Sequence, residues 1–354
     1  MGCIGQIYDP FPPWTRIAND WFPKGERDFV MHLMTQSNNI GGGFGSIIPA
    51  YQVYSGRSIS FMLLWQALAG TAILALSFFV APFRPPVHAE FDAYHQEQLR
   101  KSVDVSTVLA IFRQMLADFR CMLSDINFVL LLTAFSVQTG ISWVFLAVVG
   151  QLIGPCGYDT SIVGGALSGF GFAGVFGSLF LANVLRVWHR GYNIVQKVCF
   201  VVCGGVCLWC LGANQPGNAA NVVSAYIIYG IVSCPLTPIA LEYGAEMTYP
   251  IPADNSAALL FTGVNMVFLA VTLGVGPLLA NDPVSVTCSS VMSKAAIVIT
   301  VFTIFGSVVA LPMKATYRRT AVTVPCSEDD TAGLEKGGEL LGKGVQSPMN
   351  DPAQ

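Results

Sequence analysis

Charged residues are widely spaced along this chain, and the stretches between them are long and apolar. A helix needs roughly 20 apolar residues to cross a bilayer. The charge-poor stretches reach about that length, and one of them is long enough for two helices. We therefore predict eight membrane-spanning helices, within Phe29–Gly56, Ser58–Phe83, Ile126–Tyr158, Thr160–Leu185, Val198–Leu241 (two helices), Asn255–Asn281 and Ala295–Met313.

The stretch from Pro235 to Pro252 departs from this pattern, because prolines and carboxylates interrupt an apolar run. Pro235 and Pro238 each remove a backbone N–H and clash with the carbonyl one turn back, so a helix there kinks or opens. Glu242 and Glu246 follow four residues apart, which places them on one helical face. A closing pair of prolines ends the helix. The sequence predicts a broken helix that carries a carboxylate face.

Composition places the chain in a membrane. Of its 354 residues, 53% are hydrophobic and 11% are charged, and the mean hydropathy is +0.58. Soluble domains carry about 25% charged residues. The sequence therefore predicts an all-α, polytopic membrane protein whose surroundings are the lipid bilayer. It has no basic patch interleaved with aromatic residues, which argues against nucleic acid as a partner.

No catalytic or phosphate-binding constellation is visible in the sequence. Gly41–Gly45 is glycine-rich but is not followed by a Lys-Ser/Thr pair, so it is not a phosphate-binding loop. No Ser/His/Asp set is apparent, and the ten cysteines lack the paired spacing of zinc ligands. We expect a protein that is not an enzyme, that needs no cofactor or metal, and that handles a small molecule.

Lys and Arg gather on alternate sides of the spans, which predicts that both termini are cytoplasmic. The multi-pass protein would then sit in the plasma membrane or an organelle membrane. The polar linker after the second span becomes amphipathic, and we expect Leu99–Ser124 to lie as a helix on the cytoplasmic membrane face. The predicted organisation is a cytoplasmic segment (1–27), two helices of an incomplete N-terminal bundle (28–83), the linker (84–125), a six-helix C-terminal bundle (126–313) and a disordered cytoplasmic tail (314–354).

The first predicted helix is too polar to face lipid on all sides. Gln36 and Asn39 share one of its faces with Gly43, and His32 lies one turn earlier. One interpretation is a helix that lines a polar substrate path. The alternative is that these side chains are interhelical hydrogen-bonding groups, which hold helices together in membranes. His32 fits the second interpretation best, as a hydrogen-bonded core residue.

The third predicted helix carries Gln138 and Trp143, with Trp143 near its middle. Tryptophans in membrane proteins usually sit at the membrane interface. A buried aromatic face beside a cavity can instead hold an organic cation, worth roughly 2 kcal/mol or more when desolvated. The alternative is a lipid-facing or core tryptophan. Asn265, the main polar side chain of the seventh predicted helix, is a further substrate-binding candidate.

The carboxylates Glu242 and Glu246 have two interpretations. In the first, they take up a proton or bind a cation in a gating step. In the second, they anchor the cytoplasmic end of their helix by pairing with Arg186, Arg190 or Lys197. Carboxylates near a bilayer are normally paired, hydrated or at its edge, and both interpretations satisfy that condition.

Small residues and cysteines in the later helices indicate packing. The segment Val163–Ser178 is rich in Gly, Ala and Ser, which predicts close approach of a neighbouring helix. The four cysteines of Cys199–Cys210 form a stripe that one straight helix cannot wrap around a tetrahedral metal, so we interpret them as core residues. Cys156 and Cys288 fall on the same side of the membrane and allow a disulfide.

Several motifs, taken in order, resemble FLVCR-type transporters, the family named for the feline leukaemia virus subgroup C receptor within the major facilitator superfamily. The most specific match is Leu241–Pro250, which resembles the end of that family's tenth helix. The resemblance extends over about Trp14 to Leu311. Its other motifs are Trp21-Phe22, Glu26-Arg27, Ser37–Gly41, Pro49, Pro82–Ala89, and Asn127–Leu131 with Gly140.

The resemblance implies that the eight predicted helices correspond to family helices five to twelve, with the first four missing from this chain. It implies choline, ethanolamine or haem as substrate, carried by alternating access. Trp143 would hold the cation where the family has a tyrosine, and Asn39 and Asn265 stand where it has glutamines. Gln36 and Gln138 would orient the substrate. The alternative is a non-transporting scaffold or regulator that associates with a full-length relative or with a missing N-terminal half.

Overall fold

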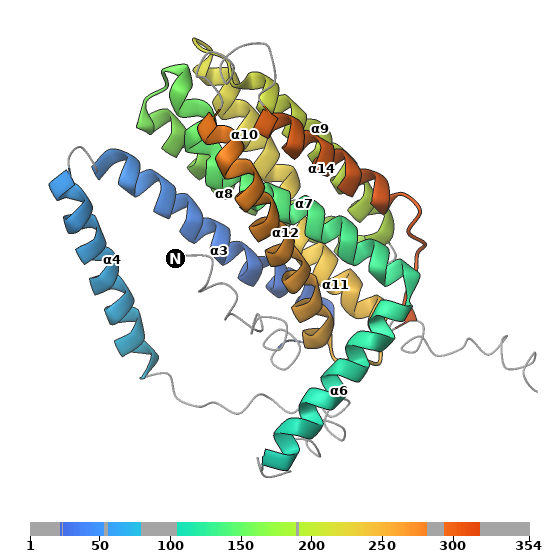
Figure 1. Cartoon of the computed structure of the whole chain (residues 1–354). Helices are drawn as coiled ribbons and strands as arrows, with labels where there is room; N and C mark the ends of the chain where they lie inside the picture. Colours follow the sequence, from blue (N-terminus) through green and yellow to red (C-terminus); the bar gives the residue numbers. More distant parts are fainter. Residues whose placement is uncertain are drawn as a thin grey trace, which may run out of the picture.

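A computed structural model describes residues 22, 24–52, 56–78, 105–188, 191–281 and 294–318, which form helices and no strands (Figure 1). The all-α expectation is confirmed for these residues. The helices are α3 (Lys24–Gln52), α4 (Gly56–Ser77), α6 (Val105–Ser124), α7 (Ile126–Ile153), the short 3-10 helix η1 (Gly154–Cys156), α8 (Thr160–Val187), α9 (Tyr192–Ala213), α10 (Ala219–Ser233), α11 (Leu236–Thr248), α12 (Ala253–Asn281) and α14 (Lys294–Ala310).

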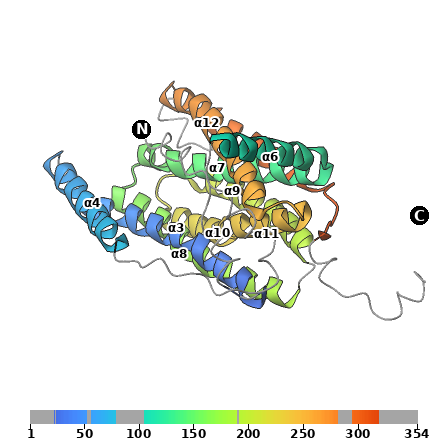
Figure 2. The same ribbon diagram turned by 90° about the horizontal axis from the view of Figure 1, so that it is seen from below.

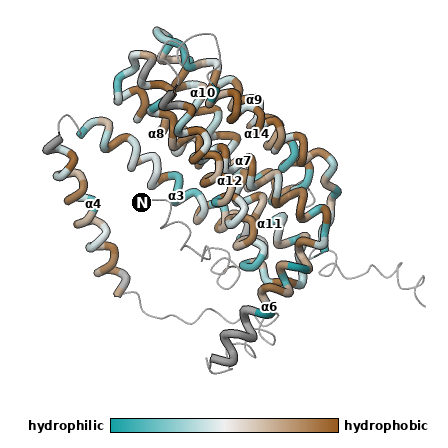
Figure 3. Tube along the Cα trace, viewed as in Figure 1, coloured by the Kyte–Doolittle hydropathy of each residue, from teal (hydrophilic) through white to brown (hydrophobic). Residues whose placement is uncertain are grey.

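Each of the predicted spans is occupied by a helix, and the composition of these helices makes this a multi-pass integral membrane protein. Six described segments are long and apolar enough to cross a bilayer, with α10 and α11 counted together as Ala219–Thr248. The helix α14 is apolar but shorter, at 17 residues. The helix α3 is 29 residues long but more polar, as Figure 3 shows by its paler and teal colouring.

One face of the helix α3 buries several polar side chains, while large apolar side chains of the same helix are exposed. His32, Thr35 and Gln36 are buried, whereas Leu33 and Phe44 are exposed. This is the reverse of a helix on the surface of a soluble protein, and it suits a helix with lipid on one side and protein on the other. The expectation that α3 cannot face lipid on all sides is confirmed.

The helix α7 lies at the centre, flanked by α12 and α14, with α9 and α10 behind it. The helix α3 runs along α8, and α8 runs along α10. Seen from below, α12 and α6 lie on one side and α3 and α8 on the opposite side (Figure 2). The helix α4 stands apart: none of its apolar segment Ser58–Leu76 is buried within the chain.

Glycines on two faces of α8 explain how closely it packs. A Cβ added at Gly164 would lie 2.5 Å from Cβ of Ala50, and one added at Gly171 would lie 2.7 Å from the carbonyl oxygen of Asn39, both on α3. On another face, a Cβ added at Gly177 would overlap the carbonyl of Ile231 on α10. Any larger residue would therefore push the helices apart. The predicted close packing of Val163–Ser178 is confirmed.

Polar residues tie the α6 end of the bundle together. Asn255 at the start of α12 donates to Asp118 of α6 at 2.8 Å. Asp125 caps α7 and also pairs with Arg318 at 2.7 Å. Lys314 and Arg318, at the start of the predicted disordered tail (314–354), therefore contact the bundle. The rest of that tail, from residue 319, and the linker residues 84–104 lie outside the described residues.

The predicted linker helix is observed over Val105–Ser124 as α6, while residues 99–104 lie outside the described residues; its placement on the cytoplasmic membrane face stays a prediction. Phe119 and Met122 face the bundle, whereas Leu116 and Leu123 are exposed. An apolar side that is left uncovered by protein is what a helix lying against a membrane surface requires.

Candidate functional site

The two amides predicted on α3 contact each other. Gln36 is fully buried, and its Oε1 accepts a hydrogen bond from Nδ2 of half-buried Asn39 at 2.7 Å. The Nε2 of Gln36 donates to the backbone carbonyl of Cys234 at 3.2 Å. Both ends of the Gln36 amide are thus engaged, and it joins α3 to the break between α10 and α11.

That break lies where the two prolines predicted it. The helix α10 ends at Ser233 and α11 begins at Leu236. In a continuous helix, the carbonyl of Cys234 would accept from the N–H of residue 238, which a proline lacks. Gln36 supplies that hydrogen bond from another helix. The carbonyl of Ile231 lacks a helical donor for the same reason, because the residue four positions later is Pro235. This carbonyl lies against Gly177 of α8.

His32, one turn before Gln36, joins α3 to α8 instead. It is 3% exposed, and its Nδ1 lies 2.8 Å from Oγ of Ser178 on α8. The expected role of His32 as a hydrogen-bonded core residue is confirmed.

Trp143 lies on the α12 side of α7. Its ring is half-buried and meets Phe268 of α12 edge to face, with centroids 6.1 Å apart. Asn265 lies one turn before Phe268 and donates to the carbonyl of Phe261 in its own helix at 3.0 Å. Gly140 allows this approach, because a Cβ there would lie 3.0 Å from Val267. Trp143 and Phe268 are in contact, and Asn265 lies three residues before Phe268 on α12; we call these three residues the aromatic group.

Gln138 lies on a different side of α7. Five residues along a helix turn it by about 140° relative to Trp143. It is buried, and its Oε1 would lie 3.3 Å from a Cβ at Gly306 of α14. The thiol of Cys203, a weak donor, lies beside it. Among the described residues, no hydrogen bond or ring contact joins Gln138, the aromatic group and the α3 amides into a single cluster.

Glu242 and Glu246 both lie on α11, as predicted, with Glu242 half-buried and Glu246 9% exposed. Neither is a free carboxylate, because each makes an interaction within the protein. Arg190, one of the predicted partners, lies outside the described residues.

A polar junction at the α6 end was missed in the sequence. The hydroxyl of buried Tyr243 on α11 accepts from Nδ2 of Asn193 on α9 at 2.9 Å and donates to the carbonyl of Lys314 at 3.2 Å. The backbone N–H of Lys314 donates to Asn127 of α7 at 2.9 Å. These residues are far apart in the chain, and no local pattern marks them as partners.

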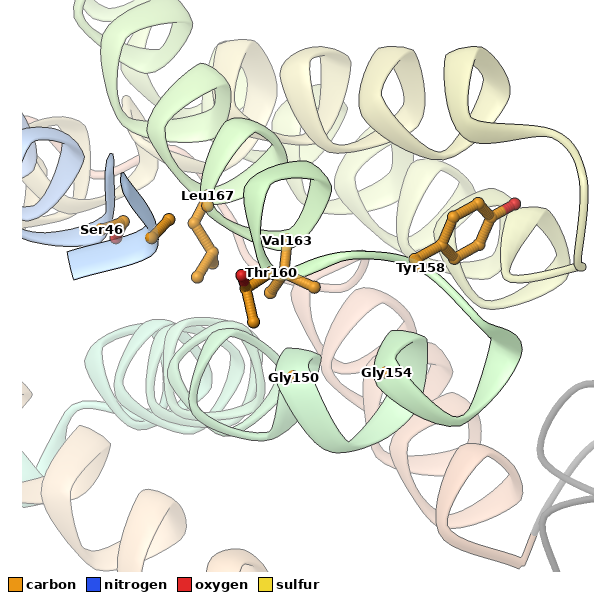
Figure 4. A pocket seen from close by; sticks show the side chains of 9 residues that line it. Ser46, Gly150, Gly154, Tyr158, Thr160, Val163 and Leu167 are labelled. Carbon is orange, nitrogen blue, oxygen red and sulfur yellow. The ribbon is translucent and has the colours of Figure 1, made fainter. Parts of the chain in front are cut away.

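A pocket of about 220 Å³ opens at the opposite end of the bundle, between α3, α7 and α8 (Figure 4). Its hydroxyls are engaged: Ser46 donates to its own helix, and Tyr158 reaches toward the turn that joins α9 and α10, where it contacts Gln215 and Asn218. The predicted site residues are not part of its lining, which consists of Ser46, Ala50, Gly150, Gly154, Tyr158, Thr160, Val163, Gly164 and Leu167.

The cysteine stripe of α9 lies in the core, as predicted. The α9 stripe, Cys199 to Cys210, is buried and consists of free thiols. Within the described ranges, no group of three or more His, Cys, Asp or Glu side chains is placed to hold a metal. Cys156 is disulfide-bonded, while Cys288 lies outside the described residues.

A bundle of long apolar helices with a proline-broken member and buried amides defines a polytopic, all-helical membrane protein. The chain matches the family model described as Major Facilitator Superfamily over residues 10–251, which is more than half of its length. The chain belongs to the major facilitator superfamily.

Curated relatives agree with this assignment. The chain is 23% identical over 252 residues to the Danio rerio protein named Solute carrier family 49 member A3, covering 70% of this chain and 50% of the relative. It is 24% identical over 307 residues to a Caenorhabditis elegans protein named as an uncharacterized MFS-type transporter, covering 83% of this chain and 49% of the relative. The chain thus spans about half the length of the curated relatives it matches.

Proposed function

We propose that this protein transports a small organic cation, choline or ethanolamine, across a membrane by alternating access. Family membership supports transport, and the edge-to-face contact of Trp143 with Phe268, three residues along α12 from Asn265, is the observation that carries the substrate class. A tryptophan face attracts a quaternary ammonium through its ring quadrupole. Haem, the other substrate that the FLVCR resemblance implies, is the competing ligand.

The proposed roles of the polar residues follow from their free atoms. Asn265 and Asn39 each use Nδ2 in an intramolecular hydrogen bond, so each keeps Oδ1 as an acceptor for a substrate hydroxyl or ammonium group. Gln36 positions Asn39. Gln138 lies on the α14 side of α7, away from the aromatic group. We therefore assign it a supporting role in place of direct contact with a substrate at that group.

In this proposal α3 and α4 belong to one bundle and α7 to α14 to the other, with both termini cytoplasmic. Transporters of this superfamily alternate access by moving one bundle against the other. Glu242 and Glu246, on the segment after the break, would secure or gate the cytoplasmic end. The chain spans about half the length of the relatives it matches, so transport by two moving bundles is part of this proposal.

Thermal unfolding of the purified chain tests the proposal. A ligand at about 100 times its Kd stabilises the folded state by about 2.7 kcal/mol, which corresponds to several degrees for a protein of this size. We expect choline to raise the unfolding temperature more than potassium at equal ionic strength. If only haem raised the unfolding temperature, haem would take the place of choline as the proposed substrate. No response to either, together with co-purification of a full-length relative, would support the scaffold instead.

A further inference from the structure

We propose that Gln36 is a positioning residue that couples a substrate bound at Asn39 to the break between α10 and α11. This inference rests on the proposed function, because it assigns a role to a residue beside the proposed substrate. The coupling runs through two hydrogen bonds, Asn39 Nδ2 to Gln36 Oε1 at 2.7 Å and Gln36 Nε2 to the carbonyl of Cys234 at 3.2 Å.

The first step is that the break between α10 and α11 leaves the Cys234 carbonyl in need of a hydrogen-bond donor from another helix. The carbonyl of Cys234 loses its helical partner because residue 238 is proline, and a buried carbonyl without a donor is costly. Cys234 is 6% exposed, so water has little access to this site. The Gln36 side chain therefore meets a requirement that α10 and α11 cannot meet themselves.

The second step is that the buried Gln36 amide bonds the Cys234 carbonyl and Asn39 at the same time, so a change at one partner affects the other. Gln36 is 0% exposed, and its amide uses Nε2 toward the break and Oε1 toward Asn39. A shift of the Cys234 carbonyl must therefore turn or release the amide, and with it the side chain of Asn39. Linked hydrogen bonds also polarise one another, which strengthens such a chain in a low-dielectric interior.

The third step is that Asn39 is the accessible end of this chain of bonds. It is half-buried, and its Oδ1 remains available after Nδ2 has bonded to Gln36. A ligand that donates a hydrogen bond, such as the hydroxyl of choline or the ammonium of ethanolamine, fits that oxygen. Binding there favours the orientation of Asn39 that keeps Gln36 on Cys234, and so favours one arrangement of the break.

A double-mutant cycle with Pro238 separates this role from ordinary packing. Gln36→Met keeps the length of the side chain and removes both hydrogen bonds. Pro238→Ala restores a backbone N–H that can satisfy the carbonyl of Cys234. We expect Gln36→Met to lower the unfolding temperature of the purified chain by about 3–6 °C, and by less than half as much when Pro238→Ala is also present.

Ligand binding gives the second readout. We expect Gln36→Met to weaken choline binding about tenfold in both backgrounds, because Asn39 loses its anchor in each. In the unmutated protein, choline should slow hydrogen exchange of the amides in residues 229–245, and Gln36→Met should abolish that protection. Ser37→Ala, which removes an exposed hydroxyl bonded within α3, is the matched control and should change neither readout.

Two results would overturn the inference. Equal temperature losses from Gln36→Met with and without Pro238→Ala would mean that Gln36 does not serve the break. Choline protection of residues 229–245 that survives in Gln36→Met would mean that the coupling takes another route. If choline has no effect on the unmutated protein, the proposed function fails, and the temperature cycle still decides whether Gln36 serves the break.

Discussion

Gly177 of α8 lies with its Cα directly against the backbone carbonyl of Ile231 on α10. That carbonyl has no helical partner, because the residue four positions later is Pro235. A Cα–H group can serve as a weak hydrogen-bond donor to it. Because Gly177 has no side chain, α8 can approach the Ile231 carbonyl, which Pro235 leaves without a helical donor.

Replacement of Gly177 by alanine should destabilise the protein. The added methyl group would overlap the Ile231 carbonyl and force α8 from α10, an overpacking effect that typically costs about 1–3 kcal/mol. We expect a fall of several degrees in the unfolding temperature of the purified protein. Gly165→Ala on the same helix is the control, because a Cβ there meets nothing within 4 Å. It should be neutral or slightly stabilising, since alanine favours a helix more than glycine does. Equal losses for both variants would contradict the packing argument.

Loss of the Tyr243 hydroxyl should loosen the α6 end of the bundle. Tyr243→Phe removes the acceptor for Asn193 and the donor to Lys314. Breaking buried hydrogen bonds of this kind costs about 1–3 kcal/mol, and thermal unfolding should report it. Tyr51→Phe, at an exposed tyrosine of α3, serves as the control. The junction would be unimportant if the two variants unfolded at the same temperature.

Thiol labelling should separate the described free cysteines into two classes. Cys121 is exposed on α6, whereas Cys234 and the α9 stripe of Cys199, Cys203, Cys207 and Cys210 are buried. Reaction requires an accessible thiolate, so maleimide should modify Cys121 rapidly in the folded protein and the buried five only after unfolding. Peptide mass spectrometry reads each site separately. Rapid labelling of the α9 stripe would show that α9 faces an accessible path instead of the core.

Local sequence patterns predicted the elements of this fold well, because the cost of burying charge and unpaired backbone in a membrane leaves few alternatives. Pro235 and Pro238 located the helix break, and the small residues of Val163–Ser178 located the close packing. The same patterns did not predict which helices those residues would contact. The pairing of Gln36 with Cys234 depends on the packing of α3 against α8, which no local pattern encodes.

The same reason decides which of the predicted site residues lie near one another. Trp143 contacts α12 at Phe268, three residues beyond Asn265, because α7 and α12 pack closely at Gly140. Gln138 was grouped with Trp143 because they are close in sequence, but five residues turn it toward α14. Phe268 was missed, since a phenylalanine in an apolar helix carries no signal of its own, and its spacing of three residues from Asn265 was the available clue.

Trp143 is the residue on which the proposed cation site depends most directly. Trp143→Ala should abolish choline uptake by cells that express the protein at normal levels, and it should weaken choline binding about tenfold or more, because a desolvated cation–π contact is worth roughly 2 kcal/mol. Trp143→Phe keeps a smaller ring and should retain part of the affinity. Trp209, 40% exposed on α9, provides the matched control, and Trp209→Ala should bind choline normally. If Trp143→Ala binds and transports as well as the unmutated protein, the ring acts only in packing against Phe268, and the cation site must be sought elsewhere.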